Sequence, residues 1–341
     1  MDLKTFIKNS LNMRLRRVRI RRDAKILGSQ EWAEYFGGWF DDVSDFSVQT
    51  DGFVNLKKIG VKVPTQTARW LLGRNPNYTY CLELVDKGVM FSQEESGLVA
   101  TWNGTRFLIE PDTLYILWEL IVEDGYRCVL PRKPTLVFDI GMNVGFASLV
   151  FAARNPEALI VGFEPFGATF ARAQRNVNLN PHLAGRIFPQ NFGLSGHDAT
   201  EEWQLNVDNA AVAGKFSTTN FGRLQKVMVQ LKSASACLAR FLAEHPNRHC
   251  VVKMDCEGGE YAILEDWIKT DFCRRVDLLV MEYHELGGNG VVEVENLLRR
   301  AGFVATLNSA QQHGRTLPLG YVVAAPLARE SMSQPRNQGL S

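Results

Sequence analysis

The sequence has no long hydrophobic run. None of its apolar stretches approaches the roughly 18 residues that a membrane-spanning helix needs. The first 30 residues also lack the apolar block and the small-residue cleavage site of a secretory signal. We therefore expect a cytoplasmic protein without a membrane span.

Paired cysteines are also missing. The six cysteines contain no C-x-x-C pair, and they stand at positions 81, 128, 237, 250, 256 and 273. This scatter argues against a zinc ribbon and against a disulfide framework. We expect reduced, buried thiols and no structural metal site.

Net charge is small, at +1 over 341 residues, but it is unevenly distributed. Residues 1–30 form a basic arm that contains the run MRLRRVRIRR. Such a run is usually a solvated face, and the alternative is contact with an anionic surface. Because no nucleic-acid-binding module is recognisable, we expect no nucleic-acid partner.

The second half of the chain alternates short β-branched runs with helical stretches, which predicts an α/β fold with a mostly parallel sheet and helices on both faces. The expected strands are residues 135–140, 159–164, 186–191, 250–255, 276–282, 302–307 and 319–324. The segment 195–249 is too long for a simple connection and predicts an insertion beside the sheet.

The first half does not show this alternation of strands and helices, and its pattern predicts a smaller α+β cap. It contains aromatic clusters, a hairpin turned at Asn103-Gly104 and an amphipathic helix over 112–125. We divide the chain into the basic arm (1–30), a cap region (31–110), the sheet domain (111–326) and a disordered tail (327–341).

A glycine-rich turn follows the first strand of the sheet domain. Its pattern is D-x-G-x-N-x-G, formed by Asp139, Gly141, Asn143 and Gly145. The glycines allow a tight turn and close approach to a ligand, and the following helix offers free N–H groups. A dinucleotide fold would need G-x-G-x-x-G, and Asp139 would repel a pyrophosphate. An acid at this place suits S-adenosylmethionine, which carries a sulfonium and an ammonium.

The second strand ends in FEP, which places Glu164 25 residues after Asp139. A carboxylate at this edge can accept hydrogen bonds from both ribose hydroxyls. Phe166 follows and can pack on the adenine, and we assign Asn191, at the end of the third strand, to the same site. The two motifs on consecutive strands predict a binding site for S-adenosylmethionine.

A third block, VVKMDCEGGEYAIL, places Lys253, Asp255, Glu257 and Glu260 at the end of the fourth strand and the start of a helix. Acids in a first helical turn suit the helix dipole, which would explain Glu257 and Glu260. It does not explain Lys253 and Asp255. The carboxyl edge of an open α/β sheet is where ligands bind. We therefore place this block in the active site.

These blocks resemble the FkbM family of adenosylmethionine-dependent methyltransferases over roughly residues 110–325. The resemblance implies a seven-stranded, Rossmann-like class I methyltransferase fold and methylation of a hydroxyl on a polyketide, a sugar or a polysaccharide. It assigns cofactor binding to the glycine-turn residues and Glu164, and a site role to the third block. The segment CLARFLAEHPNRH departs from the family's usual turn before the fourth strand.

The expected reaction is transfer of a methyl group from S-adenosylmethionine to a hydroxyl of a small molecule or glycan. Asp255 is the first candidate for the base that takes the hydroxyl proton, and His284 is the second. We group Lys253 with them as catalytic. We assign substrate binding to Glu257, Glu260 and Glu282.

Three alternatives compete with this interpretation. Asp255, Glu282 and His284 could hold a divalent ion, but no tight ligand spacing supports it and we expect no metal. The fold could serve as a catalytically inactive module that binds glycans or partners. A nicotinamide-dependent oxidoreductase is disfavoured by the missing G-x-G-x-x-G.

Overall fold

The computed structural model describes residues 46–49, 51–73, 77–124, 126, 134–206, 224–285, 290–312 and 315–327. The expected basic arm, Cys128 and nearly all of the expected tail lie outside these residues. No helix in the described part is long and apolar enough to cross a bilayer.

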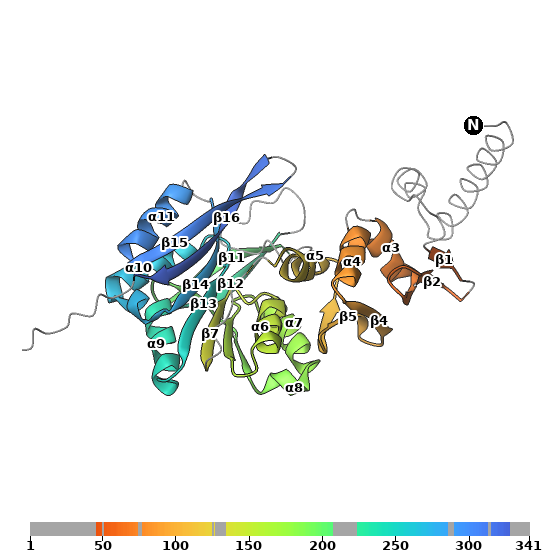
Figure 1. Ribbon diagram of the computed structural model, residues 1–341, viewed down its shortest axis with the longest axis horizontal. Coiled ribbons are helices and arrows are strands. Elements are labelled where there is room, and N and C mark those ends of the chain that lie inside the picture. The colour runs from red at the N-terminus through yellow and green to blue at the C-terminus, as the bar shows by residue number, and fades with distance from the viewer. Residues whose placement is uncertain are drawn as a thin grey trace, which may run out of the picture.

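A seven-stranded sheet forms the centre of the molecule (Figure 1). Its strand order is β15-β16-β14-β13-β7-β8-β9, and only the pairs that involve β16 are antiparallel. All seven expected strands are present, so the predicted mostly parallel sheet is confirmed. The strands are β7 (Thr135–Ile140), β8 (Leu159–Phe163), β9 (Ile187–Gln190), β13 (His249–Met254), β14 (Leu278–His284), β15 (Phe303–Gln312) and β16 (Arg315–Pro326).

Helices cover both faces of this sheet, because its central strands are apolar on both sides. In β7, Val137 belongs to the core on one face and Phe138 to the core on the other. The helices are α6 (Phe146–Arg154), α7 (Gly167–Asn178) and α8 (Pro181–Ala184) on the first face, and α9 (Ala234–Glu244), α10 (Glu260–Thr270), η4 (Phe272–Arg275) and α11 (Val291–Arg300) on the second.

The expected insertion between β9 and β13 is a separate small sheet. It consists of β10 (Gly193–Ser195), β11 (Ala199–Asn206) and β12 (Leu224–Ser233), in the order β10-β12-β11. Leu205, Val229 and Leu231 pack against Phe166 and form a small core of their own. The insertion therefore covers the turn that follows β8.

The N-terminal region extends from one side of the sheet domain (Figure 1). It holds two antiparallel sheets, and the expected hairpin turns at Asn103 and Gly104, both in the left-handed region. Its residues share one continuous hydrophobic core with α6 and α8. The elements are β1 (Phe46–Val48), β2 (Phe53–Leu56), β3 (Val61–Pro64), α3 (Thr65–Gly73), α4 (Asn77–Asp86), β4 (Met90–Glu94), β5 (Gly97–Trp102) and β6 (Thr105–Ile109).

The helix that connects this region to the sheet domain changes its winding. It begins as α5 (Leu114–Trp118) and continues as the π-helical turn η2 (Glu119–Glu123). The sequence predicts a helix over 112–125, but not the extra residue in its last turn. A π turn rotates the side chains that follow it, and such turns are frequent at functional sites.

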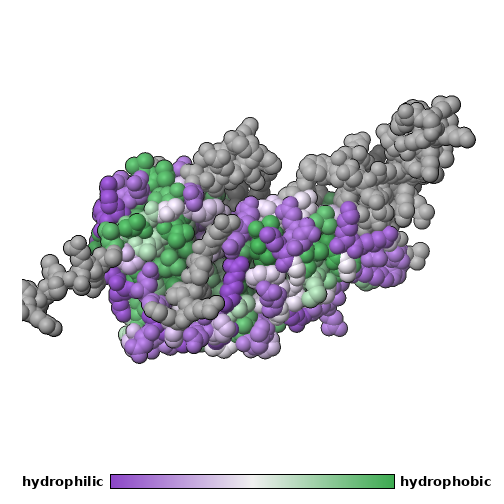
Figure 2. Space-filling view, in the orientation of Figure 1, coloured by the Kyte–Doolittle hydropathy of each residue, from purple (hydrophilic) through white to green (hydrophobic). Residues whose placement is uncertain are grey.

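Hydrophobic side chains reach the surface mainly at the end of the molecule that carries β15 and β16 (Figure 2). Val304 on β15 and Val323 on β16 are among the exposed large apolar residues. Hydrophilic residues predominate over the remainder of the visible face.

Candidate active site

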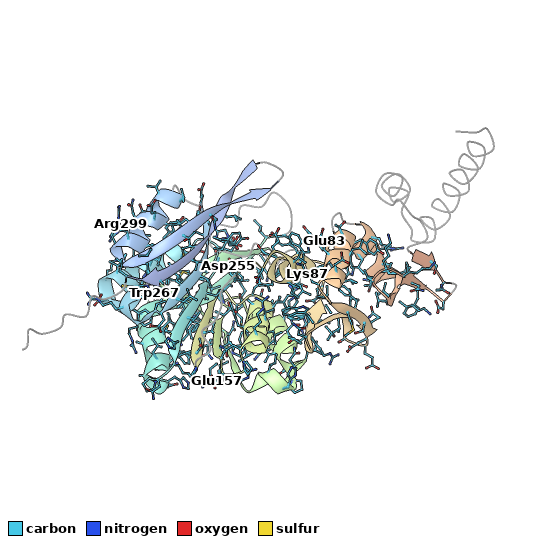
Figure 3. All side chains as sticks on the ribbon, in the orientation of Figure 1. Glu83, Lys87, Glu157, Asp255, Trp267 and Arg299 are labelled. Carbon is cyan, nitrogen blue, oxygen red and sulfur yellow. The ribbon has the colours of Figure 1, made fainter. Side chains whose placement is uncertain are left out.

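The carboxyl ends of β7, β8, β13 and β14 bring the candidate residues together. Because these strands are parallel neighbours, residues that end them lie side by side, as Asp139 and Lys253 do in the register of β7 and β13. Asp255 lies near the middle of the molecule, just beyond the end of β13 (Figure 3).

The glycine turn passes very close to the segment after β13. Gly141 has a φ of +78°, and a Cβ at this position would lie 1.7 Å from the carbonyl oxygen of Asp255. The N–H of Asp255 donates a hydrogen bond of 3.0 Å to the carbonyl oxygen of Ile140. Only glycine permits this approach.

Asp139 lies beneath the turn, fully buried, and it lines neither of the cavities described below. Its carboxylate forms an ion pair of 3.1 Å with Lys253 and accepts a hydrogen bond of 2.6 Å from Ser148. The carboxylate is therefore paired within the protein, and direct contact of Asp139 with a cationic ligand stays a prediction.

Lys253 is 2% exposed and connects the two strand ends. Its Nζ donates to the carbonyl oxygen of Gly141 at 2.7 Å and lies 3.6 Å from Asp255. Burial disfavours its charge, but Asp139 and Asp255 outweigh burial and raise the pKa of Lys253 above its usual value. A permanently protonated lysine cannot take a proton, so Lys253 acts here as a fixed cation.

Glu164 lines a cavity at the end of β8 together with Phe166 and Trp203. Its two oxygens accept the backbone N–H groups of Asn143 at 3.0 Å and Phe166 at 2.9 Å. Burial raises the pKa of Glu164 to about 7, although these hydrogen bonds favour the charged form. The rings of Phe166 and Trp203 lie 6.0 Å apart.

Two predicted residues support this cavity without lining it. The side chain of Asn191 donates to the carbonyl oxygen of Glu164 at 3.0 Å and so braces the turn after β8. Gly145, with a φ of +84°, caps the start of α6. Direct contact of either residue with a ligand stays a prediction.

A second, larger cavity of about 230 Å³ lies on the other side of the glycine turn. Its lining combines apolar side chains with polar groups, among them Glu119, Tyr126, Glu282 and His284. The two cavities share Gly141, Asn143, Asp255 and Glu257 as a common wall.

Tyrosines fix two of the acids around the larger cavity. Tyr126 donates a hydrogen bond of 2.7 Å to Asp255, and Tyr321 donates one of 2.6 Å to Glu119. Burial opposes ionisation of Asp255, yet Lys253 and His284 hold its pKa below the usual value. Asp255 therefore stays charged.

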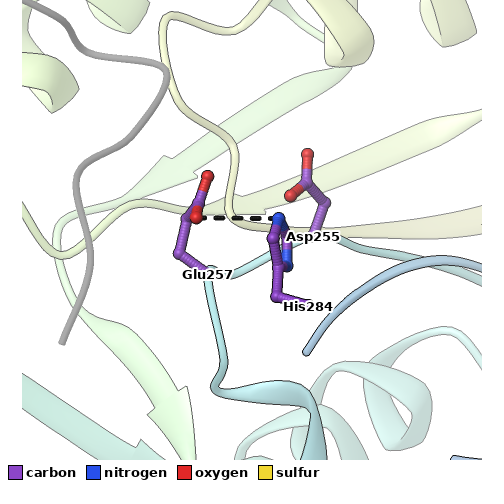
Figure 4. A group of neighbouring side chains, drawn as sticks. All are labelled: Asp255, Glu257 and His284. Carbon is purple, nitrogen blue, oxygen red and sulfur yellow. Dashed lines mark ion pairs between the residues drawn. The ribbon is translucent and has the colours of Figure 1, made fainter. Parts of the chain in front are cut away.

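His284, at the end of β14, is surrounded by carboxylates (Figure 4). Its Nδ1 lies 3.3 Å from Glu260, and its Nε2 lies 3.6 Å from Glu257 and 3.7 Å from Glu282. Burial disfavours its positive charge, but the hydrogen bond with Glu260 and the charge of Glu257 raise its pKa to about 10. At neutral pH His284 is protonated in this arrangement, which does not favour it as the base.

Burial raises the pKa of three further acids, Glu119, Glu257 and Glu282. Burial raises the pKa of Glu257 to about 7 despite the nearby His284, and it raises that of Glu119 to about 7 despite the hydrogen bond from Tyr321. The pKa of Glu282 is well above its usual value, first through burial and then through the charge of Asp255. Glu260 is fully buried and lines neither cavity. Its carboxylate accepts a hydrogen bond of 2.9 Å from the backbone N–H of Cys256.

The sequence gives little sign of several of these residues. Glu119 and Tyr126 lie in the segment 112–127, which resembles the family's lead-in but received no site role, and Trp203 and Tyr321 lie in two other segments outside the motifs. Of the four, Trp203 has a partial signal, because it lies in the insertion that the sequence predicts beside the sheet.

Comparison with known proteins places this site in a family. Residues 139–305 match the family described as the methyltransferase FkbM domain. The chain is 26% identical over 214 residues to Methyltransferase 1 of Beauveria bassiana, an alignment that covers 57% of this chain and 82% of that protein. It is 28% identical over 244 residues to Methyltransferase sdnD of Sordaria araneosa, which covers 61% and 93%.

Solved structures give more distant similarities. Methyltransferase FkbM from Methylobacillus flagellatus has 12% sequence identity and a TM-score of 0.37, with 62% of this chain and 53% of that chain covered. The human methyltransferase 10 domain containing protein has 16% identity and a TM-score of 0.38, with 73% and 93% covered.

Proposed function

Because the chain belongs to the FkbM family of methyltransferases, we propose that it uses S-adenosylmethionine to methylate a hydroxyl of a sugar, glycan or polyketide-type acceptor. The observation that carries this proposal is the common wall of the two cavities at Gly141, Asn143, Asp255 and Glu257. A methyl donor in one cavity and an acceptor in the other would meet there.

The cavity at Glu164 offers an acceptor and aromatic rings that suit S-adenosylmethionine. Its carboxylate can accept the ribose hydroxyls, and Phe166 and Trp203 offer rings to the adenine. When bound, the cofactor supplies an activated methyl group on a sulfonium. The fixed anion of Asp255 at the common wall suits that positive charge.

The larger cavity suits a polyhydroxylated acceptor. Carboxylates of Glu119, Glu257 and Glu282 can accept hydrogen bonds from hydroxyl groups, and Tyr115 and Tyr126 offer apolar faces. Alignment of the acceptor oxygen with the methyl group supplies most of the rate enhancement in such a displacement. Asp255 is placed to take the hydroxyl proton as the new bond forms.

Calorimetric titration of the purified protein tests the cofactor first. We expect saturable binding of S-adenosylmethionine and S-adenosylhomocysteine, at least tenfold weaker in Glu164→Ala, and no binding of NADH. Glu157→Ala removes an exposed acid and serves as the matched control. If a folded protein binds neither adenosyl ligand, the proposal is wrong and the binding-module alternative gains support.

The acceptor is tested next with radiolabelled S-adenosylmethionine and a panel of glycosides, polysaccharides and hydroxylated polyketides. The labelled product distinguishes O-methylation from N-methylation, because an N-methyl group survives conditions that cleave methyl ethers. Transfer to amines alone would contradict the hydroxyl part of the proposal and leave the methyltransferase assignment intact.

A further inference from the structure

His284 presents one ring nitrogen to the larger cavity and keeps the other for the protein. Its Nδ1 lies 3.3 Å from Oε1 of Glu260, which is fully buried, and the hydroxyl of Tyr261 donates to the carbonyl oxygen of His284 at 2.8 Å. Nε2 therefore faces Glu257 and Glu282. A carboxylate behind an imidazole is the arrangement that orients a metal-binding histidine.

The atoms around Nε2 have nearly the spacing of a ligand set. Nε2 lies 3.6 Å from Oε2 of Glu257 and 3.7 Å from Oε1 of Glu282. One ligand atom each from Asp255, Glu257 and His284 lie within 4.8 Å of one another. With metal–ligand bonds of about 2.1 Å, neighbouring ligands are roughly 3.0–3.4 Å apart and opposite ones roughly 4.2 Å apart. The two contacts of Nε2 exceed the spacing of neighbouring ligands by a few tenths of an ångström.

Glu282 supplies an independent indication that something is bound here. It is 8% exposed and lines the larger cavity. Among the described residues no hydrogen-bond donor reaches its carboxylate, and its one ion pair is the 3.7 Å contact with His284. A buried carboxylate without a donor is costly to ionise, because no described protein group replaces its lost hydration. A cation in the cavity would provide the missing partner.

The geometry points to a divalent-cation site formed by Asp255, Glu257 and His284, with Glu282 as a further carboxylate ligand, in which the cation takes the place of the Nε2 proton of His284 and that proton is released to solvent. The mixture of imidazole and carboxylates suits Mn²⁺ or Zn²⁺ better than Ca²⁺, which prefers oxygen ligands alone. The cluster lies at the common wall of the two cavities. A cation there would polarise an acceptor hydroxyl, and this catalytic role, unlike the binding itself, rests on the proposed function.

Mn²⁺ is the probe for the test, because its electron paramagnetic resonance spectrum reports both binding and ligands. The full-length protein is treated with EDTA, dialysed and titrated with Mn²⁺ alone. We expect one saturable Mn²⁺ per chain and a nitrogen modulation in pulsed spectra that arises from His284. Zn²⁺ should displace the bound Mn²⁺.

Three variants locate the site. His284→Gln should abolish the nitrogen modulation and weaken Mn²⁺ binding at least tenfold, and Glu282→Gln should weaken binding at least tenfold while the modulation remains. Glu295→Gln, which changes an exposed acid on α11, should leave both unchanged. Glu282→Gln keeps the shape of the side chain, so it remains informative if His284→Gln does not fold.

The result that overturns the inference is the absence of saturable Mn²⁺ and Zn²⁺ binding, or binding that neither site variant weakens. Titration of the same preparation with S-adenosylhomocysteine separates this result from failure of the proposed function. Cofactor binding without metal binding refutes only the cation site, and metal binding without cofactor binding refutes only the methyltransferase proposal.

Discussion

Glu164 has to be charged to accept ribose hydroxyls, yet burial raises its pKa to about 7. We therefore expect cofactor affinity to fall as pH decreases from 8 to 6, because the carboxylate becomes protonated over this range. Below pH 7 the decrease should approach roughly tenfold per pH unit, as for a single titrating group. Calorimetric titration with S-adenosylhomocysteine at each pH measures it.

Glu164→Gln provides the comparison for this pH dependence. The variant should bind more weakly at pH 8, and its affinity should change little between pH 8 and 6. A variant that keeps the slope of the unaltered protein would show that another group titrates, and that Glu164 does not control the interaction.

Gly141 is the residue where the backbone approach is closest. In Gly141→Ala the new Cβ would lie 1.7 Å from the carbonyl oxygen of Asp255, so the glycine turn and the end of β13 would have to separate. We expect a loss of about 3 kcal/mol or more in the free energy of unfolding, together with loss of cofactor binding. Urea unfolding measures the first effect.

Gly302→Ala measures the cost of the left-handed backbone conformation without any steric overlap, so the difference between the two variants gives the cost of the overlap with Asp255. Gly302 has a φ of +77°, nearly the same as Gly141, but a Cβ there would meet nothing within 4 Å. We expect this variant to lose only about 1 kcal/mol, the usual cost of a left-handed alanine. Equal losses in the two variants would show that the contact with Asp255 is unimportant.

At the scale of elements, α7 fastens the N-terminal region to the sheet domain through a buried side chain. Asn176 accepts the N–H of Leu108 on β6 at 2.9 Å and donates to the carbonyl oxygen of Val144 in the glycine turn at 2.9 Å. Asn176→Ala should destabilise the protein by about 2–4 kcal/mol, because it leaves two buried backbone groups without partners. Thermal unfolding measures the loss.

Asn178 is the matched control, since it lies on the same helix but is exposed. Asn178→Ala should change the free energy of unfolding by less than about 0.5 kcal/mol. If the two asparagine variants were equally stable, the hydrogen bonds between α7 and β6 would contribute nothing to stability.

The sheet was predictable from the sequence because its signals are local. Each strand is a short β-branched run with a turn or helix on either side, and the strands β7, β8 and β13 begin and end within a residue of their expected positions. The π turn η2 was not predictable, because the apolar periodicity of 112–125 fits an α-helix equally well. The turn contacts α4 and α6, and the local sequence pattern contains no information about such tertiary contacts.

The site was predictable only as far as the strand ends. Asp255, Glu257 and His284 follow parallel strands, and these meet at one edge of the sheet. Glu119 and Tyr321 lie 202 residues apart and meet only because β16 inserts between β14 and β15. Nor does sequence alone indicate that Lys253 neutralises Asp139, because that depends on burial of both.

For the whole molecule, the raised pKa values predict how stability varies with pH. Glu119, Glu164 and Glu257 have folded pKa values of about 7, above the ordinary 4.5, so their ionisation favours the unfolded chain as pH rises through this range. The pKa of His284, about 10 against 6.5, acts in the same direction from pH 6.5 upward. With EDTA present, the melting temperature should fall steadily from pH 5 to pH 9.

Asp255 does not oppose this trend, because its lowered pKa keeps it ionised throughout the range. Differential scanning calorimetry at constant ionic strength is the measurement. A melting temperature that rises from pH 5 to pH 9 would contradict the burial of these acids, since solvated carboxylates would contribute no such dependence.

The position of Lys253 affects how genetic data on this protein should be read. It compensates the buried Asp139 on β7 and the half-buried Asp255 just after β13, and removing one member of such a buried group typically costs about 3–5 kcal/mol. In a saturation mutagenesis library selected only for intact, abundant protein, variants substituted at position 253 should therefore be lost as strongly as in a library selected for activity. Intolerance to substitution there identifies a support of the fold, whereas depletion confined to the activity selection identifies a group that meets the substrate.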